Sequence, residues 1–162
     1  MQKLIKNGDI TENYWELINE DHAIEITQLK NALVPLNFWL KNEAQLLNNG
    51  KIGIWISGDT ALDSLPESVF EAEVIAISFP AFADGRGFSL ARQIREHKDF
   101  SGDIRAIGAF VPDQMYYLTR CGFSSFVLDD VDDGSINECL NAFSNGYQAA
   151  VDEPRPLFRR RN

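Results

Sequence analysis

The residues best suited to bind a ligand lie between Pro80 and Ser89. Arg86 stands there between two glycines and could form a bidentate contact with a phosphate, sulfate or carboxylate. Asp84 could orient Arg86 or accept a hydrogen bond from a ligand hydroxyl. A helix expected to begin near Ser89 would present free backbone N–H groups, which favour an anion. The segment predicts an anion site made by Asp84, Gly85, Arg86, Gly87 and Ser89.

A structural role for the same residues stays open. Asp-Gly is a common turn dipeptide, and Arg86 could pair with Asp84 or with a nearby carbonyl rather than with a ligand. The spacing Gly85-x-Gly87 is not the GxGxxG fingerprint of dinucleotide-binding proteins, and the sequence contains no GxxxxGK[ST] phosphate loop. The segment could therefore be a structural loop or a loop that docks a partner.

Asp113 and Gln114 form the second part of the predicted site. They follow the apolar run Ile104–Phe110, at the expected start of a helix from Pro112 to Cys121. The carboxyl ends of parallel strands share one edge of a sheet, so these residues should lie beside the first loop. Asp113 would also be favoured there by the helix dipole alone.

The remaining polar residues show no catalytic arrangement. Cys121 and Cys139 lack CxxC spacing, and His22 and His97 are isolated, so these residues do not readily build a zinc site or an iron–sulfur cluster. Cys139 falls in an apolar helical stripe and is expected in the core. Arg105 is expected to be a surface or salt-bridging residue on the amino-terminal side of its strand. We predict no metal and no bound cofactor, and the catalytic residues stay unknown.

Alternating strand and helix patterns would position the predicted site. The expected strands are Ala32–Val34, Ile52–Ile56, Val74–Phe79, Ile104–Phe110 and Ser125–Leu128. The nearly unbroken apolar run Val74–Phe79 suits a strand covered on both faces, as in a parallel sheet. The pattern predicts an α/β fold with a mainly parallel sheet of about five strands and helical crossovers. The sheet could be flavodoxin-like or Rossmann-like, or it could be part of a (β/α) barrel.

The two ends of the chain differ from this pattern. Lys3–Lys6 and Tyr14–Ile18 are short strand candidates, with Asn7-Gly8 as a turn between them. We predict that residues 1–30 form a small antiparallel appendage of the same domain. Residues 31–150 would then be the α/β domain, and residues 151–162 a flexible basic tail.

Charge and hydropathy exclude several function classes. The chain has 24 Asp plus Glu and 15 Lys plus Arg, a formal net charge of −9, which disfavours nucleic-acid binding. No apolar run is long enough to span a membrane. The amino-terminal residues lack the pattern of a signal peptide, so we expect a cytoplasmic protein. The sequence leaves open whether the protein forms a homo-oligomer.

Two ordered motifs point to a known family. They are Phe79-Pro80-x-Phe82-x-Asp84-Gly85-Arg86-Gly87-Phe88-Ser89-x-Ala91-Arg92 and Arg120-Cys121-Gly122-Phe123. Together with Arg105-Ala106-x-Gly108 and Asp113-Gln114 between them, they resemble a bacterial family catalogued as domain of unknown function nine hundred thirty-four. The resemblance covers roughly residues 31–128. Its members are often labelled probable oxidoreductases of sulfite reduction, which implies a role beside the haem-containing sulfite reductase.

The residues and the resemblance together predict an accessory protein of assimilatory sulfite reduction. It would bind a small anionic metabolite at Asp84–Ser89 or dock on the sulfite reductase haemoprotein, without a redox cofactor of its own. One alternative is an oxidoreductase that uses a loosely bound flavin or nicotinamide. Another is a metabolite-sensing module of the flavodoxin-like type.

Overall fold

The computed structural model describes residues 2–19, 25–49, 51–129, 133–142, 146 and 148–160. Its strands are β1 (Lys3–Lys6), β2 (Asp9–Glu12), β3 (Glu16–Leu17), β4 (Ala32–Pro35), β5 (Ile52–Ser57), β6 (Val74–Phe79), β7 (Asp103–Gly108) and β8 (Ser125–Leu128). Its α-helices are α1 (Leu36–Leu47), α2 (Arg86–Lys98), α3 (Met115–Arg120), α4 (Asp133–Leu140) and α5 (Leu157–Arg160). Short 3-10 helices cover Ile26–Gln28, Leu62–Ser64, Glu67–Glu71 and Pro112–Gln114. None of the described helices is long and apolar enough to cross a membrane.

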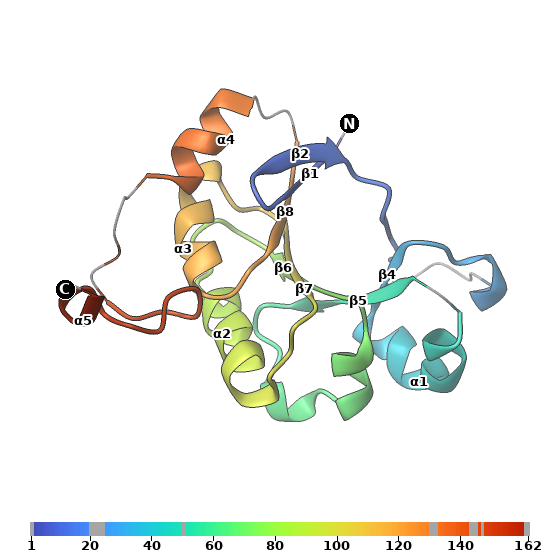
Figure 1. The fold of residues 1–162 in the computed structure, drawn as a ribbon. Coiled ribbons are helices and arrows are strands. Elements are labelled where there is room, and N and C mark those ends of the chain that lie inside the picture. Colours follow the sequence, from blue (N-terminus) through green and yellow to red (C-terminus); the bar gives the residue numbers. More distant parts are fainter. Residues whose placement is uncertain are drawn as a thin grey trace.

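The eight strands of the described residues all belong to one curved sheet, in the order β2-β1-β8-β7-β6-β5-β4-β3. Strands β3 to β8 pair in parallel, whereas β1 is antiparallel to both β2 and β8. Helices α1 to α4 lie along the outer side of the sheet (Figure 1). From β4 to β8 the spatial order follows the chain, without the reversal found in a doubly wound sheet. The predicted α/β fold with a mainly parallel sheet and an antiparallel amino-terminal part is confirmed.

The sheet is larger than the sequence predicts, with eight strands instead of about five. The hairpin partner of β1 is β2, whose sequence Asp-Ile-Thr-Glu has no apolar run. The expected antiparallel strand Tyr14–Ile18 is wrong: only Glu16–Leu17 forms a strand there, and it runs parallel to β4. A strand of two residues is too short to show a period-two pattern, so its neighbour determines its direction.

The side chains of the parallel strands alternate between two faces of the sheet. The outer face packs under the helices and includes Ile54, Ile75, Ile77, Ile104 and Phe126. The inner face carries a smaller apolar cluster, made by Leu4, Leu33, Val74, Ala76, Ile107 and Val127, against which Trp15 and Trp55 pack. Apolar side chains on both faces explain the nearly unbroken apolar runs of these strands.

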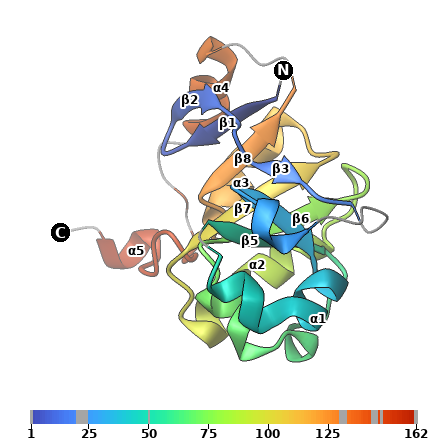
Figure 2. The ribbon, with the colours of Figure 1, turned by 90° about the vertical axis from the view of Figure 1, so that its right-hand side faces the viewer.

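Three residues carry the chain between the two ends of the sheet. β2 is one edge strand of the curled sheet and β3 is the other, so Asn13–Trp15 joins the two edges (Figure 2). The far end of this segment is fixed by hydrogen bonds from the Glu16 N–H to the Asn31 carbonyl and from the Ile18 N–H to the Leu33 carbonyl, each 2.9 Å. We call Asn13–Trp15 the strap.

The carboxyl-terminal segment runs beside α3. The sequence predicts a flexible basic tail for residues 151–162. In its described part, the Val151 N–H donates to the Arg120 carbonyl at 3.1 Å, and Arg120 Nη1 lies 3.5 Å from Asp152 Oδ1. Arg160 of α5 lies 4.0 Å from Glu153. These contacts join part of the segment to α3, and the flexibility of residues 151–162 stays a prediction.

Candidate functional site

The residues predicted to bind an anion lie at the carboxyl edge of the parallel strands. The loop with Asp84 follows β6, and the turn with Asp113 and Gln114 follows β7. The structure joins these segments, because Gln114 Nε2 donates to the Phe82 carbonyl at 2.9 Å. Gln114 Oε1 also accepts from the Val111 N–H at 3.1 Å. Gln114 therefore uses its side-chain amide to hold the two loops together.

Helix α2 begins earlier than the sequence predicts. It starts at Arg86 rather than near Ser89, so Gly85 immediately precedes the helix and Ser89 lies exposed on its surface. The Arg86 N–H already donates to Asp84 Oδ1 at 3.1 Å, and the Phe88 N–H donates to the Gly85 carbonyl at 3.2 Å. Two backbone donors at the start of α2 are therefore occupied within the protein.

Arg86 is held by two carboxylates. Its Nε and Nη2 donate to Asp84 at 2.9 and 2.7 Å, and its Nη1 donates to Asp59 Oδ2 at 3.2 Å. Hydrogen bonds from the side chain and backbone of Arg86 lower the pKa of Asp84 to about 2. A hydrogen bond with the Ser57 side chain is the main cause that lowers the pKa of Asp59. Two carboxylates surround one guanidinium, a balance that does not favour a further anion.

The two glycines of this turn have different surroundings. A Cβ on Gly87 would lie 2.8 Å from the Phe79 ring and 3.2 Å from Ile77 Cγ2. A Cβ on Gly58 would lie 2.9 Å from the backbone nitrogen of Gly87. A Cβ on Gly85 would have no atom within 4 Å, and its φ of −82° suits any residue. Close packing therefore requires glycine at position 87 but not at position 85.

We expect Gly87→Ala to lower the free energy of unfolding by about 1–3 kcal/mol, because the added methyl group overlaps the Phe79 ring. Gly85→Ala is the matched control in the same turn and should change that free energy by no more than about 0.5 kcal/mol. Urea unfolding followed by circular dichroism measures both variants. Equal effects of the two substitutions would contradict the packing role of Gly87.

Asp113 has a neighbour that the sequence does not predict. Cys139 Sγ donates to Asp113 Oδ1 at 3.6 Å. Cys139 is half-buried, so its expected place in the core is wrong. Burial raises the pKa of the Cys139 and Cys121 thiols, the opposite of what a nucleophilic cysteine needs. Within the described ranges, no group of three or more His, Cys, Asp or Glu could hold a metal ion.

A cavity of about 790 Å³ opens at the same edge of the sheet, beside the strap. Its apolar lining includes Leu33, Ile107 and Val127 of the inner face together with Trp15, Leu17 and Phe110. Its polar lining includes Gln2, Asn13, Ser78, Asp129 and Ser135. None of the described residues that line it is Lys or Arg. Apolar walls with a few polar groups are typical of small-molecule sites.

A second cavity, of about 570 Å³, lies near the amino-terminal end of β8. Arg95 lines it, but its guanidinium already donates to the backbone carbonyls of Gly122 at 2.9 Å, Phe100 at 2.5 Å and Gly102 at 2.8 Å. Gly122 has a φ of +108°, in the left-handed region that favours glycine. Arg95 and Gly122 therefore build the turn between α3 and β8.

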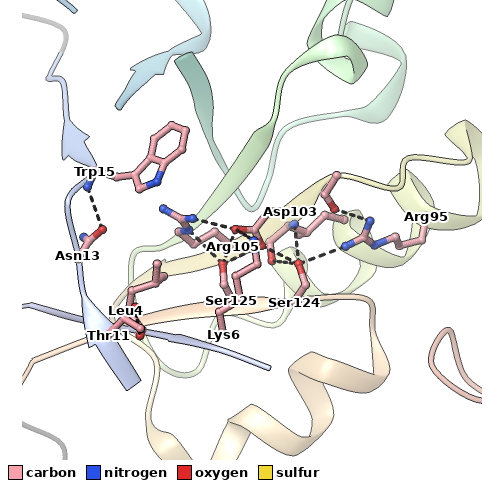
Figure 3. A network of polar contacts seen from close by, with 12 residues as sticks. Leu4, Lys6, Thr11, Asn13, Trp15, Arg95, Asp103, Arg105, Ser124 and Ser125 are labelled. Carbon is pink, nitrogen blue, oxygen red and sulfur yellow. Dashed lines mark hydrogen bonds and ion pairs between the residues drawn. The ribbon is translucent and has the colours of Figure 1, made fainter. Parts of the chain in front are cut away.

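Trp15 of the strap contacts both the first cavity and a buried polar network on the inner face. Its ring lines the cavity, and its centroid lies 5.1 Å from Arg105 Cζ. Arg105 Nε donates to Ser125 Oγ at 3.0 Å, and Nη2 donates to Asp103 Oδ2 at 2.8 Å. Figure 3 shows the guanidinium on the Trp15 side of this network. Trp15 is therefore part of the cover that leaves Arg105 only 2% exposed.

Asp103 is the centre of the network. Its carboxylate accepts hydrogen bonds from Ser124 Oγ at 2.6 Å, from Ser125 Oγ at 2.8 Å and from Arg105, and it lies 3.5 Å from Lys6 Nζ. Burial acts to raise the pKa of Asp103. Hydrogen bonds from the two serines, together with the charge and hydrogen bond of Arg105, outweigh burial and lower the pKa below its usual value. Asp103 is therefore ionised at neutral pH and holds Arg105 in place.

The sequence did not reveal this network. Arg105 was expected to be a surface or salt-bridging residue, and its ion pair with Asp103 exists, but both side chains are buried, at 2% and 4% exposure. A signal was available, because Arg105 is the only charged residue of the apolar run Ile104–Phe110 and shares a strand face with Ile107. Trp15 carries no such signal, since it reaches the inner face only through the strap.

A sequence-family model described as "Bacterial protein of unknown function (DUF934)" matches residues 53–158. The matched range contains the Asp84–Ser89 segment, Arg105 and the β8 wall of the cavity, and the strap precedes it. Searches of curated proteins and of solved structures found no match.

Proposed function

The chain belongs to the bacterial family of unknown function DUF934, and we propose that it is an accessory protein of sulfite reduction that binds a small metabolite at the carboxyl edge of its sheet. The link to sulfite reduction is supported by the resemblance of the motifs around Asp84–Ser89 and Arg120–Phe123 to a family with that label. The binding function is supported by the geometry of the cavity.

The observation that carries the binding function is the cavity of about 790 Å³. Small-molecule sites commonly have volumes of about 300–1,000 Å³. The cavity lies where β7 and β8 end, on the side where α/β proteins bind ligands. The sequential strand order, with helices outside, is that of part of a (β/α) barrel, and barrel enzymes use this same edge. The strand order gives no support to the flavodoxin-like sensor.

The lining favours a compact molecule with a large apolar surface. Leu33, Ile107 and Val127 offer apolar contacts, and Ser78 and Asn13 offer hydrogen bonds. The predicted anion site at Asp84–Ser89 is less favourable, because Arg86 is already paired with two carboxylates. We therefore assign the metabolite to the cavity, and the Asp84–Ser89 site is the alternative that an experiment must distinguish.

A thermal-shift screen of the full chain tests the binding function, because a ligand that binds only the folded state raises the melting temperature. The compounds are sulfite, sulfate, adenylyl sulfates, flavins, nicotinamides and a set of small ring compounds. Two substitutions assign the site. Ser78→Leu fills part of the cavity, and Ser89→Leu adds the same side chain to the exposed surface of α2. We expect a compound that stabilises the wild type and Ser89→Leu but not Ser78→Leu.

Other outcomes overturn parts of the proposal. Loss of stabilisation in Ser89→Leu alone would move the site to Asp84–Ser89. A screen in which no compound raises the melting temperature would contradict the binding function. A stoichiometric flavin in the purified protein, seen by absorbance and mass spectrometry, would replace the accessory role with that of an oxidoreductase.

Docking on the sulfite reductase haemoprotein is the second part of the proposal. Sedimentation velocity of the two purified proteins, alone and mixed at micromolar concentration, tests it. We expect a faster boundary in the mixture that contains both proteins. Two unchanged boundaries would contradict docking while leaving the binding function intact.

A further inference from the structure

We infer that the cavity continues to Arg105, and that its ligand combines an apolar ring with one oxyanion, a carboxylate or a sulfonate, which binds the Arg105 guanidinium once the Trp15 indole has moved aside. The inference rests on the proposed binding function of the cavity and adds the chemical class of the ligand. It also moves the predicted anion-binding role from Arg86 to Arg105, which the sequence analysis did not include in the predicted site.

Arg105 has one nitrogen without a hydrogen-bond partner. Nε donates to Ser125 and Nη2 donates to Asp103, but Nη1 has no partner among the described residues. The side chain is only 2% exposed, so water does not replace the missing acceptor at its surface. Buried donors are nearly always paired, because an unpaired donor loses its hydrogen bonds with water and gains none. Nη1 is therefore a donor suited to an oxygen of a ligand.

The charge around Arg105 also favours an anion. Arg105 and Lys6 both lie within reach of a single carboxylate, that of Asp103, at 2.8 and 3.5 Å. Among the described groups, this ion-paired cluster therefore carries one positive charge in excess. The cluster around Arg86 has the opposite balance, with one guanidinium and two carboxylates. Of the two clusters, the one around Asp103, in which the Lys6 side chain is 47% exposed and Arg105 is buried, has the charge that an oxyanion would neutralise.

Trp15 stands between Arg105 and the cavity. Its ring lies 5.1 Å from Arg105 Cζ and at the same time lines the cavity wall. The strap that carries it has a long backbone hydrogen bond at its start, and the shorter ones begin only beyond its end, at Glu16 and Ile18. The Asn13 N–H donates to the Gln2 carbonyl at 3.4 Å, the Trp15 N–H is satisfied by the side chain of Asn13, and Tyr14 is 71% exposed. A segment with few contacts to the body opens at low cost in free energy.

The spacing of the inner face sets the size of the ligand. Ile107 lines the cavity and lies two residues beyond Arg105 on the same face of β7, a separation of about 6–7 Å. An aromatic ring resting on Ile107 and Val127 could therefore place a carboxylate attached to it beside Arg105. Guanidinium and carboxylate groups match in geometry and form charge-assisted hydrogen bonds.

The inference is tested with pairs of ligands that differ only in charge. Benzoate, phenylacetate and naphthalene-2-carboxylate are titrated into the full chain beside their uncharged carboxamides, with ligand-observed NMR and isothermal titration calorimetry. We expect at least one carboxylate to bind on the order of tenfold more tightly than its carboxamide. In Arg105→Gln this preference should disappear, while the carboxamide binds as it does to the wild type.

Trp15→Ala keeps the test decisive if Arg105→Gln does not fold, because it leaves the Arg105–Asp103 pair in place. Removal of the indole should strengthen binding of the carboxylate at least about threefold and retain its preference over the carboxamide. A gain in carboxylate affinity below twofold, or loss of the preference over the carboxamide, would overturn the inference. Equal binding of carboxylate and carboxamide to the wild type would also overturn it but would leave the binding function standing. Failure of every compound to bind would overturn both.

Discussion

Substitution of Asp103 by alanine is expected to lower the free energy of unfolding by about 3–5 kcal/mol. The Arg105 guanidinium would stay buried without its carboxylate, because its side chain is only 2% exposed. Ser124 and Ser125 would lose the acceptor of their hydroxyl groups as well. Urea unfolding followed by circular dichroism measures the loss.

Two controls distinguish the cost in stability of leaving a charge buried without a partner from the cost of losing any ion pair. Glu67→Ala removes the partner of Lys98 in a pair whose Glu67 side chain is 80% exposed, and should cost less than about 1 kcal/mol. The double variant Asp103→Ala/Arg105→Met should recover most of the lost stability, since no charge then stays buried without a partner. A cost for Asp103→Ala as small as that for Glu67→Ala would contradict the buried network.

The same pair predicts how stability depends on pH. The pKa of Asp103 is lower in the folded protein than its usual value, which is about 3.9 in an unfolded chain. The folded state therefore binds this proton less readily than the unfolded state. The stability that Asp103 provides is fully present above about pH 5, begins to be lost as the pH falls through the unfolded value, and is gone below the folded pKa. In Asp103→Ala this part of the acid dependence should be absent.

Substitution of Phe79 by alanine is expected to cost about 3–5 kcal/mol as well, for a different physical reason. Phe79 is 2% exposed, and its ring centroid lies 5.6 to 6.1 Å from those of Phe88, Phe110 and Phe123. The ring also forms the surface on which Gly87 of α2 packs. Its removal would leave a cavity where β6 meets α2 and the segment after β7. Thermal and urea unfolding of the variant measure the effect.

Phe82 is the matched control within the same motif. Its side chain is 65% exposed, so Phe82→Ala should change the free energy of unfolding by no more than about 0.5 kcal/mol. The two phenylalanines of this motif therefore differ in role: Phe79 packs in the core, and Phe82 lies at the surface. Similar costs for the two substitutions would contradict that distinction.

The parallel part of the fold could be predicted from the sequence because its signals are local. An unbroken apolar strand such as Val74–Phe79 reports burial on both faces, and helical spacing between strands implies parallel neighbours. The hairpin partner of β1 and the position of β3 depend on segments far away in the chain. Leu4 pairs with Val127, and Glu16 pairs with Ala32. Neither pairing can be recognised from a hydrophobic periodicity in the local sequence.

The candidate site was predictable to the same extent. The carboxyl-edge rule correctly placed the loops that contain Asp84 and Asp113 on one edge. It could not show that Arg86 reaches Asp59 from another loop, 27 residues away. It also could not place Trp15 over Arg105, because that contact depends on the strap joining the two edges of the sheet.

The pairing of β1 with β8 has a consequence for synthesis of the protein. β1 leaves the ribosome long before β8, so the pairing of β1 with β8 must wait until β8 has been synthesised. The cavity beside Trp15 is lined by Val127 and Leu128 of β8 and is therefore complete only after β8 has emerged. A metabolite that needs the complete cavity would therefore find its site only after the ribosome has synthesised residues 127 and 128.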